Sequence, residues 1–153
     1  MPSETSLAES QYYGHPRNAF WPIMGSLLGF DASLPYAQRL ALLTAGGIAL
    51  WDVVDRCDRH ASSDASIRNV RTNAIADLLR GEPTLRAVAL NGTKAAQLFR
   101  RHVAPDLGSA SALEVLALPS TSPAHAALTV AAKLQQWRAL TPWLRASGDG
   151  AEP

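Results

Sequence analysis

The sequence predicts an α/β domain built on a short parallel sheet with helices on both of its faces. Three short apolar runs are nearly continuous rather than alternating, which is typical of strands buried on both faces of such a sheet. Segments with apolar residues at helical spacing separate these runs, and this alternation favours a parallel sheet. The length of 153 residues and the hydrophobic fraction of 47% fit one domain with one core.

The elements can be assigned in chain order. The predicted strands are GIALWDVV, LRAVALN and ALEVLALP, at residues 47–54, 85–91 and 112–119. The predicted helices cover residues 19–30, 34–45, 67–80, 93–103 and 128–140. Asn18 can cap the first helix, Gly46 can end the second and Gly81 can end the third. These elements predict one domain at residues 1–145, followed by a disordered tail at residues 146–153.

The composition narrows the class of protein. No stretch approaches the roughly 20 apolar residues that span a bilayer, and no secretory signal pattern is found. Cys57 is the single cysteine, which excludes an internal disulfide and a multi-cysteine metal site, so a reducing, cytoplasmic location is expected. The net charge of +1 neither requires nor excludes nucleic acid. Of the 14 basic residues, only Lys94 and Lys133 are lysines, and the others are arginines. This excess of arginine fits contacts with phosphate groups. The alternative explanation for the excess is a GC-rich genome, whose codons favour arginine.

A ligand site is expected at the carboxyl ends of the strands, where loops with small polar side chains gather. Asn91 ends the second predicted strand, and Lys94 lies in the first turn of the next helix, whose free N–H groups suit a phosphate or a base edge. A plain turn capped by Thr93 is the alternative. Asp52, inside an apolar run, needs partners, which are either a ligand or backbone N–H groups.

The loop LPSTSPAH, residues 118–125, follows the third predicted strand. Hydroxyl groups and exposed backbone N–H groups are common phosphate binders. The candidate phosphate-binding residues here are Ser120, Thr121, Ser122 and His125. A turn that caps the following helix is the alternative.

The segment YYGHPRNAFW, residues 12–21, is dense in aromatic and hydrogen-bonding groups. Its rings, Tyr13 among them, can stack on a flat base. Asn18 can bind a base edge or orient a water, and His15 and Arg17 can reach a phosphate. The alternative is that the aromatic rings pack into the hydrophobic core. The combination of aromatic, amide and basic groups nevertheless favours a nucleobase pocket.

Other chemistries lack a motif. The histidines show no HxxxH or HxH spacing that would indicate a metal site. No GxSxG elbow, Walker loop or GxGxxG fingerprint is found. The sequence therefore gives no support to nucleophilic catalysis or to a metal centre.

The segments YYGHPRNAFWPIM, GIALWDV, LNGTKA and LPSTSPAHA resemble the uracil-DNA glycosylase superfamily, and most of all its hypoxanthine-DNA (deoxyinosine) glycosylases. The resemblance covers about residues 2–140. It implies a three-layer α/β/α fold and hydrolysis of the N-glycosidic bond of a deaminated base in DNA, which initiates base excision repair. It also implies that the base is flipped out of the duplex, that no cofactor or metal is used, and that a monomer acts at the nucleoid, upstream of abasic-site repair enzymes.

The resemblance also assigns roles to residues of this chain. Asn18 would orient the attacking water or hold the base as the bond breaks, and Phe20 would stack on the flipped base. Ser120, Thr121 and Ser122 would pinch phosphates, and the residues near Ala124 and His125 would push into the gap left by the base. The candidate base-binding residues are Phe20, Tyr13, Asp52 and Asn91, and the candidate DNA-binding residues are His15, Arg17, Lys94, Ser120, Thr121, Ser122 and His125.

The chain departs from the family pattern at its beginning. Relatives open with an apolar strand that ends in a glycine-rich turn, whereas this chain opens inside that turn, at Met1 and Pro2. The first strand of the central sheet is therefore expected to be missing. Either the start codon is assigned too late, or the protein is a shortened relative; the first is favoured because an unpaired central edge is costly.

Three alternatives remain open at this point. One is uracil as the preferred base, and another is a non-catalytic relative that binds damaged DNA. The third is a nucleotide-binding module unrelated to DNA, which predicts no steep salt dependence of DNA binding.

Overall fold

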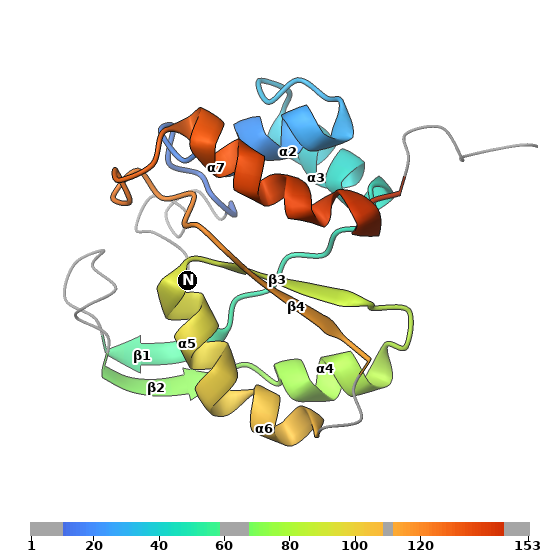
Figure 1. The fold of residues 1–153 in the computed structure, drawn as a ribbon, viewed down its shortest axis with the longest axis vertical. Helices are drawn as coiled ribbons and strands as arrows, with labels where there is room; N and C mark the ends of the chain where they lie inside the picture. Colours follow the sequence, from blue (N-terminus) through green and yellow to red (C-terminus); the bar gives the residue numbers. More distant parts are fainter. Residues whose placement is uncertain (1–10, 59–67, 109–111, 146–153) are drawn as a thin grey trace, which may run out of the picture.

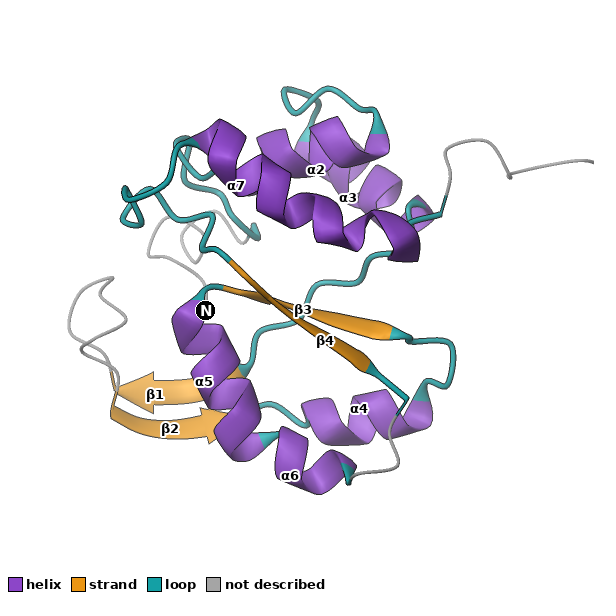
Figure 2. Ribbon diagram, in the orientation of Figure 1, coloured by secondary structure: helices purple, strands orange, loops and turns teal. Residues whose placement is uncertain are grey.

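A short parallel sheet separates two layers of helices in the computed structural model, which describes residues 11–58, 68–108 and 112–145 (Figure 1). The sheet consists of β3 (Ala87–Asn91) and β4 (Glu114–Leu118), with Ala87 opposite Glu114 and Asn91 opposite Leu118. One layer holds α2 (Phe20–Leu28), α3 (Tyr36–Ala45), α7 (Val130–Trp137) and the 3-10 helix η2 (Arg138–Trp143). The other layer holds α4 (Ile75–Gly81), α5 (Thr93–His102) and α6 (Ala104–Leu107) (Figure 2). This arrangement confirms the predicted α/β class with a short parallel sheet between helices.

Each layer has its own hydrophobic cluster. The first cluster gathers buried residues of α2, α7 and η2 around Leu118 of β4. The second gathers buried residues of α4 and α5 around Leu90 of β3. Both faces of the sheet are therefore used, as the continuous apolar runs predict. Val115 nevertheless remains 45% exposed, because only two strands pair in the described part of this sheet.

Four of the predicted helices are confirmed to within a few residues. They correspond to α2, α3, α5 and the α7–η2 pair. The last of these changes from α-helix to 3-10 helix after Trp137. Pro142 lies inside η2 and has no N–H to donate to the carbonyl of Arg138, so the regular α-helical ladder cannot continue there.

The predicted strand at residues 47–54 is wrong. Its residues before Val54 form an extended connector that runs from the layer of α3 toward the other layer (Figure 1). Ile48 and Leu50 pack against the first cluster, and Val53 packs against the second. The apolar residues are thus buried by crossing between layers rather than by joining the sheet.

The predicted helix at residues 67–80 is wrong in its first half. Residues 68–72 form β2 (Arg68–Thr72), which pairs antiparallel with β1 (Val54–Asp58), and α4 begins only at Ile75. Asn73 separates the two elements. Its backbone N–H donates to the carbonyl of Val53 at 3.0 Å, and its Nδ2 donates to the carbonyl of Asp52 at 2.7 Å. These bonds fix the start of α4 against the connector.

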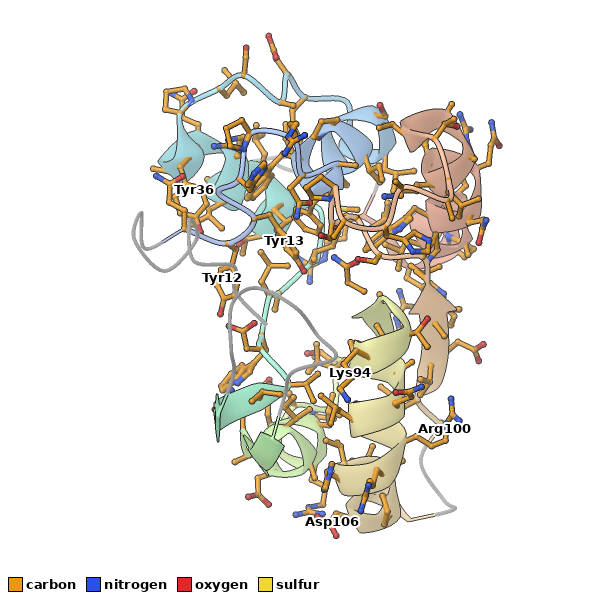
Figure 3. The ribbon with its side chains drawn as sticks, turned by 90° about the vertical axis from the view of Figure 1, so that its left-hand side faces the viewer. Tyr12, Tyr13, Tyr36, Lys94, Arg100 and Asp106 are labelled. Carbon is orange, nitrogen blue, oxygen red and sulfur yellow. The ribbon has the colours of Figure 1, made fainter. Side chains whose placement is uncertain are left out.

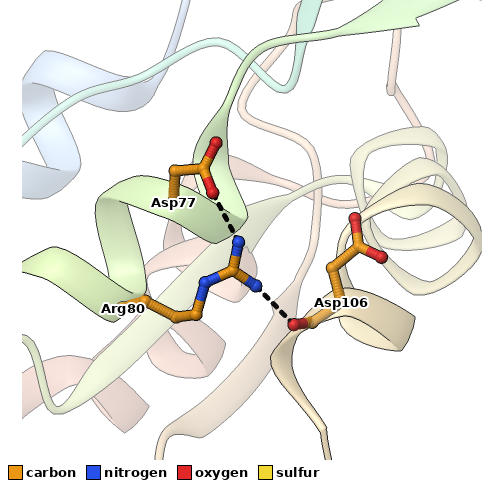
Figure 4. A network of polar contacts seen from close by, with 3 residues as sticks. All are labelled: Asp77, Arg80 and Asp106. Carbon is orange, nitrogen blue, oxygen red and sulfur yellow. Dashed lines mark hydrogen bonds and ion pairs between the residues drawn. The ribbon is translucent and has the colours of Figure 1, made fainter.

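A polar network joins α4 to α6 on the surface (Figure 4). The Arg80 guanidinium pairs with the Asp77 carboxylate one turn earlier, and its Nη1 donates to the carbonyl of Asp106 at 2.6 Å. Exposed ion pairs contribute little to stability, about 0–1 kcal/mol, so this contact orients α6 more than it stabilises the fold. No helix in the described ranges is long and apolar enough to cross a membrane. The predicted tail at residues 146–153 lies outside the described residues.

Candidate active site

The predicted site residues gather at the carboxyl end of the parallel sheet, where β3 ends at Asn91 and β4 ends at Leu118. Gly92 follows Asn91 with a φ of 97°, and its N–H donates to the carbonyl of Leu118 at 2.9 Å. A side chain at Gly92 would put a Cβ 3.0 Å from the Cβ of Ser120. A glycine is therefore required where the two strand ends approach each other.

Asn91 and Thr121 form a paired contact between the two strand ends. Asn91 Nδ2 donates to Thr121 Oγ1 at 2.9 Å, and the Thr121 N–H donates to Asn91 Oδ1 at 2.9 Å. The Thr121 carbonyl accepts a third bond, from the N–H of Ala19 at 3.0 Å. Three distant segments of the chain are thus locked together at this point.

This paired contact corrects one predicted role. The Thr121 side chain is 1% exposed and is bonded to Asn91, so it is not available to a phosphate. Thr121 and Asn91 instead position the loops around them. Burial of the Thr121 side chain is tolerated because the Asn91 amide satisfies its hydroxyl.

Asn18 lies beside this contact, just before α2. Its Oδ1 accepts the N–H of Phe20 at 3.0 Å, and its own N–H donates to the carbonyl of His15 at 2.9 Å. The side chain is partly exposed, and its Nδ2 donates to no other described residue. The amide is therefore held in place by one end and presents two N–H donors at the other.

The aromatic residues do not take the predicted arrangement. Phe20 is 2% exposed, and the Tyr13 ring stacks on it with centroids 3.9 Å apart and planes 22° apart. Phe20 also meets Trp21 and Trp137 edge-on. The predicted stacking of Phe20 on a base is therefore corrected: Phe20 is a core residue that supports Tyr13, and the half-buried Tyr13 is the ring nearer the solvent.

Tyr13 is also unusual in its backbone and in its hydroxyl. Its φ is 56°, the one positive φ of a non-glycine residue in the described ranges. Burial, with a smaller contribution from the Asp52 carboxylate, raises the pKa of its hydroxyl to about 12, against the opposite effect of a hydrogen bond with Asn91. Burial and Asp52 also raise the pKa of Tyr12. Asp52 therefore acts on both tyrosines, whereas Asn91 acts on Tyr13.

The loop after β4 is held mainly by its own hydroxyls. Ser120 Oγ accepts the N–H of Ser122 at 3.2 Å, and Ser122 Oγ accepts the N–H of Ala124 at 3.2 Å. The N–H of His125 donates to the Ser122 carbonyl at 3.1 Å. Both serine side chains are partly exposed, so their O–H groups can still reach a phosphate while their oxygens shape the turn.

The predicted basic contacts lie around the same end of the sheet. His15 Nδ1 accepts the N–H of Arg17 at 3.1 Å, and the Arg17 side chain is exposed. Figure 3 views this end of the sheet and shows Lys94 on the face that also carries Tyr12 and Tyr13. The described residues contain no group of three or more His, Cys, Asp or Glu side chains that could hold a metal ion.

Comparison with known proteins decides the family. No protein-family model matches the chain. It is similar over 92% of its length to the solution NMR structure of a "putative Uracil DNA glycosylase" from Methanosarcina acetivorans, with a TM-score of 0.76, 30% identity and 83% of that chain covered. The chain belongs to the uracil-DNA glycosylase superfamily.

Two curated relatives narrow the resemblance within this superfamily. Proteins named hypoxanthine DNA glycosylase, from Methanosarcina barkeri and Methanosarcina acetivorans, are 37% and 35% identical to it over 98 residues. Each match covers 63% of this chain and spans 62% of the relative's own length. The resemblance to hypoxanthine glycosylases inferred from the motifs is therefore confirmed.

Sequence reasoning missed one residue that contacts the loop after β4, Lys133 on α7. Its side chain is 4% exposed, and its Nζ donates to the carbonyl of Ser122 at 3.1 Å. Burial lowers the pKa of this ammonium. The sequence contained one signal for this contact: Lys133 shares a helical face with the apolar residues Leu134 and Trp137. A lysine buried on such a face needs a hydrogen-bond acceptor nearby.

Proposed function

We propose that the chain is a monofunctional DNA glycosylase that hydrolyses the N-glycosidic bond of a deaminated base, with hypoxanthine as the preferred base. The observation that carries the proposal is the Asn18 amide, whose Oδ1 is held by the N–H of Phe20 while its Nδ2 donates to no other described residue. The names of the two curated relatives support hypoxanthine as the base. The proposal includes action as a monomer at the nucleoid and transfer of the abasic product to downstream repair enzymes.

The reaction needs stabilisation of charge rather than a strong nucleophile. As the bond breaks, positive charge develops on the sugar and negative charge on the leaving base. Water then adds its hydroxyl to the sugar carbon, and its proton balances the charge on the base. Donors fixed in advance near the developing charge lower the barrier to this step.

Each residue of the site takes a part in this mechanism. Asn18 orients the water or donates to the base, and Tyr13 stacks on the flipped base. Ser120 and Ser122 contact phosphates on either side of the lesion.

Deletion of the Asn18 amide tests the proposal. A labelled oligonucleotide with one deoxyinosine is incubated with wild type or Asn18→Ala and treated with alkali, which cuts abasic sites. We expect excision to fall about 100- to 1,000-fold, as for the loss of a fixed donor. Gln38→Ala, which removes an exposed amide from α3, is the matched control and should leave the rate unchanged. Full excision by Asn18→Ala removes Asn18 from the mechanism, and no excision by wild type overturns the proposed activity.

Uracil is the second candidate base, because the similar solved structure carries that base in its name. The same assay with one deoxyuridine measures the ratio of the two rates. A faster rate with deoxyuridine would reverse the proposed preference while keeping the reaction. Binding of either lesion without cleavage would instead identify a non-catalytic relative.

A further inference from the structure

A cavity of about 300 Å³ lies at the amino-terminal end of the parallel sheet, opposite the candidate active site. Three segments line it: the chain just after α3, the residues that lead into β3, and the chain at the end of η2. Figure 1 shows these segments on the side of the sheet away from the start of α5. The glycosylase mechanism uses none of them.

Two guanidinium groups define this cavity. Arg86 lies over the ring of Trp143, with its Cζ 5.7 Å from the ring centroid. The Arg145 N–H donates to the carbonyl of Gly46 at 3.1 Å, which holds its backbone beside the turn after α3. A Cβ on Gly47 would lie 3.3 Å from Arg145 Cγ, so the side chain passes closely over that turn.

Among the described residues, no carboxylate lines the cavity to neutralise the two arginines. Thr84, Leu85 and Ala87 complete most of its lining, and no carboxylate belongs to it. Neither arginine forms an ion pair with a described carboxylate. Two positive charges that share one concave wall repel each other, and a bound anion would remove that repulsion.

The chemistry of the lining points to a phosphate that carries a flat ring. Planar guanidinium groups match phosphate oxygens with paired hydrogen bonds, and the Thr84 hydroxyl adds a donor. The Trp143 indole provides an aromatic wall for an aromatic ligand. The volume lies at the lower end of the range for small-molecule sites, about 300–1,000 Å³, which suits one nucleotide rather than a duplex.

We propose that Arg86, Arg145 and Trp143 form a second binding site, which takes a nucleotide through its phosphate. The nucleotide is either free or the end of a nucleic-acid strand, because both present the same phosphate and base. This site is independent of the proposed glycosylase activity. It leaves the carboxyl end of the sheet open to damaged DNA.

The test is a titration with deoxyadenosine monophosphate followed by amide NMR. We expect saturable shifts in Thr84–Ala87 and in the Trp143 indole, and no such shifts with deoxyadenosine, which lacks the phosphate. The double variant Arg86→Gln, Arg145→Gln should weaken the affinity at least about tenfold. Arg138→Gln, which removes an exposed arginine of η2 outside the cavity, should change it less than twofold.

Further arms separate the outcomes. A short single-stranded oligonucleotide that binds more tightly than the mononucleotide, with the same loss in the double variant, identifies a strand end as the ligand, and equal affinity identifies a free nucleotide. Arg86→Lys, Arg145→Lys keeps both charges and should retain intermediate affinity, which distinguishes loss of the site from loss of the fold. Deoxyinosine excision should be unchanged in both double variants. Absence of saturable shifts, shifts confined to Asn18 and its neighbours, or wild-type affinity in the Gln variant each overturn the proposal.

Discussion

Tyr13 combines a positive φ, a stacked ring and a weakly acidic hydroxyl in one residue. A non-glycine residue with φ near 56° costs about 1–3 kcal/mol, and such residues cluster at functional sites. The stacking on Phe20 and the hydrogen bond with Asn91 stabilise this conformation. We infer that the strain is kept because it turns the ring toward the carboxyl end of the sheet.

The raised pKa of Tyr13 gives a pH dependence of stability with a definite sign. Its ordinary value is 10.0 and its value in the folded protein is about 12, so the native state favours the neutral phenol. The corresponding stability is fully present below pH 10 and is lost as the pH rises through about 12. In urea unfolding at a series of pH values, wild type should lose stability in this window relative to Tyr13→Phe. Parallel curves for the two proteins would contradict the assignment.

At the scale of elements, the turn between β3 and α5 requires a residue without a side chain. Gly92→Ala combines a strained φ of 97° with a Cβ contact at 3.0 Å, so we expect a loss of roughly 1–3 kcal/mol in the free energy of unfolding. Gly81→Ala is the control, because a Cβ at the end of α4 meets no atom within 4 Å. That change should be neutral or slightly stabilising. Equal effects of the two changes in thermal unfolding would exclude the proposed close approach.

Lys133 links α7 to the loop after β4. Lys133→Met keeps the apolar stem and removes the donor to Ser122, so the loop loses one fixed point while the cost of burying an ammonium disappears. We expect DNA binding to weaken about tenfold or more, since a hydrogen bond to a charged group contributes roughly 1.5–3 kcal/mol, with only a small change in stability. Lys133→Arg, which keeps the charge, should restore part of the affinity, as measured by fluorescence anisotropy with a labelled oligonucleotide.

The same lysine has a pH signature. Because burial lowers its pKa below 10.5, the unfolded chain binds more protons than the folded chain just below pH 10.5. The stability of wild type relative to Lys133→Met should therefore rise with pH in that window. A difference that does not change with pH would mean that the ammonium is better hydrated than its burial indicates.

The helices α2, α3 and α5 could be predicted from the sequence because their signals are local: periodic apolar residues and glycines near the ends. The connector before Val54 could not, since an apolar run that crosses between two layers has the same composition as a buried strand. The site was predicted in part. Asn18 lies at the predicted end of the sheet. The burial of Thr121, however, depends on its hydrogen bonds with Asn91. Phe20 is covered by the ring of Tyr13, whose direction depends on the positive φ of Tyr13. Such contacts are not encoded in either residue alone.

At the scale of the whole molecule, the candidate DNA contacts gather at one end of the sheet and the Arg80 network lies in the helical layer of α4 and α6. Arg17→Met and Lys94→Met should each reduce the slope of log affinity against log salt by about one, because each removes one phosphate contact. Arg80→Gln should leave the slope unchanged, since this guanidinium is already engaged by Asp77 and Asp106. Fluorescence anisotropy at several salt concentrations measures these slopes.

The division of the core into two clusters has a consequence for synthesis on the ribosome. The buried residues of the second cluster all lie between Ile75 and Val103, so this half can pack while translation continues. The first cluster joins α2, which emerges early, to Leu118, Trp137 and Leu140, which emerge near the end. Residues of α3 such as Leu43 can cover α2 early, but the part of its apolar face that meets Leu118, Trp137 and Leu140 waits until most of the protein has been made. A chaperone that binds exposed apolar segments is therefore expected to engage α2 during that interval.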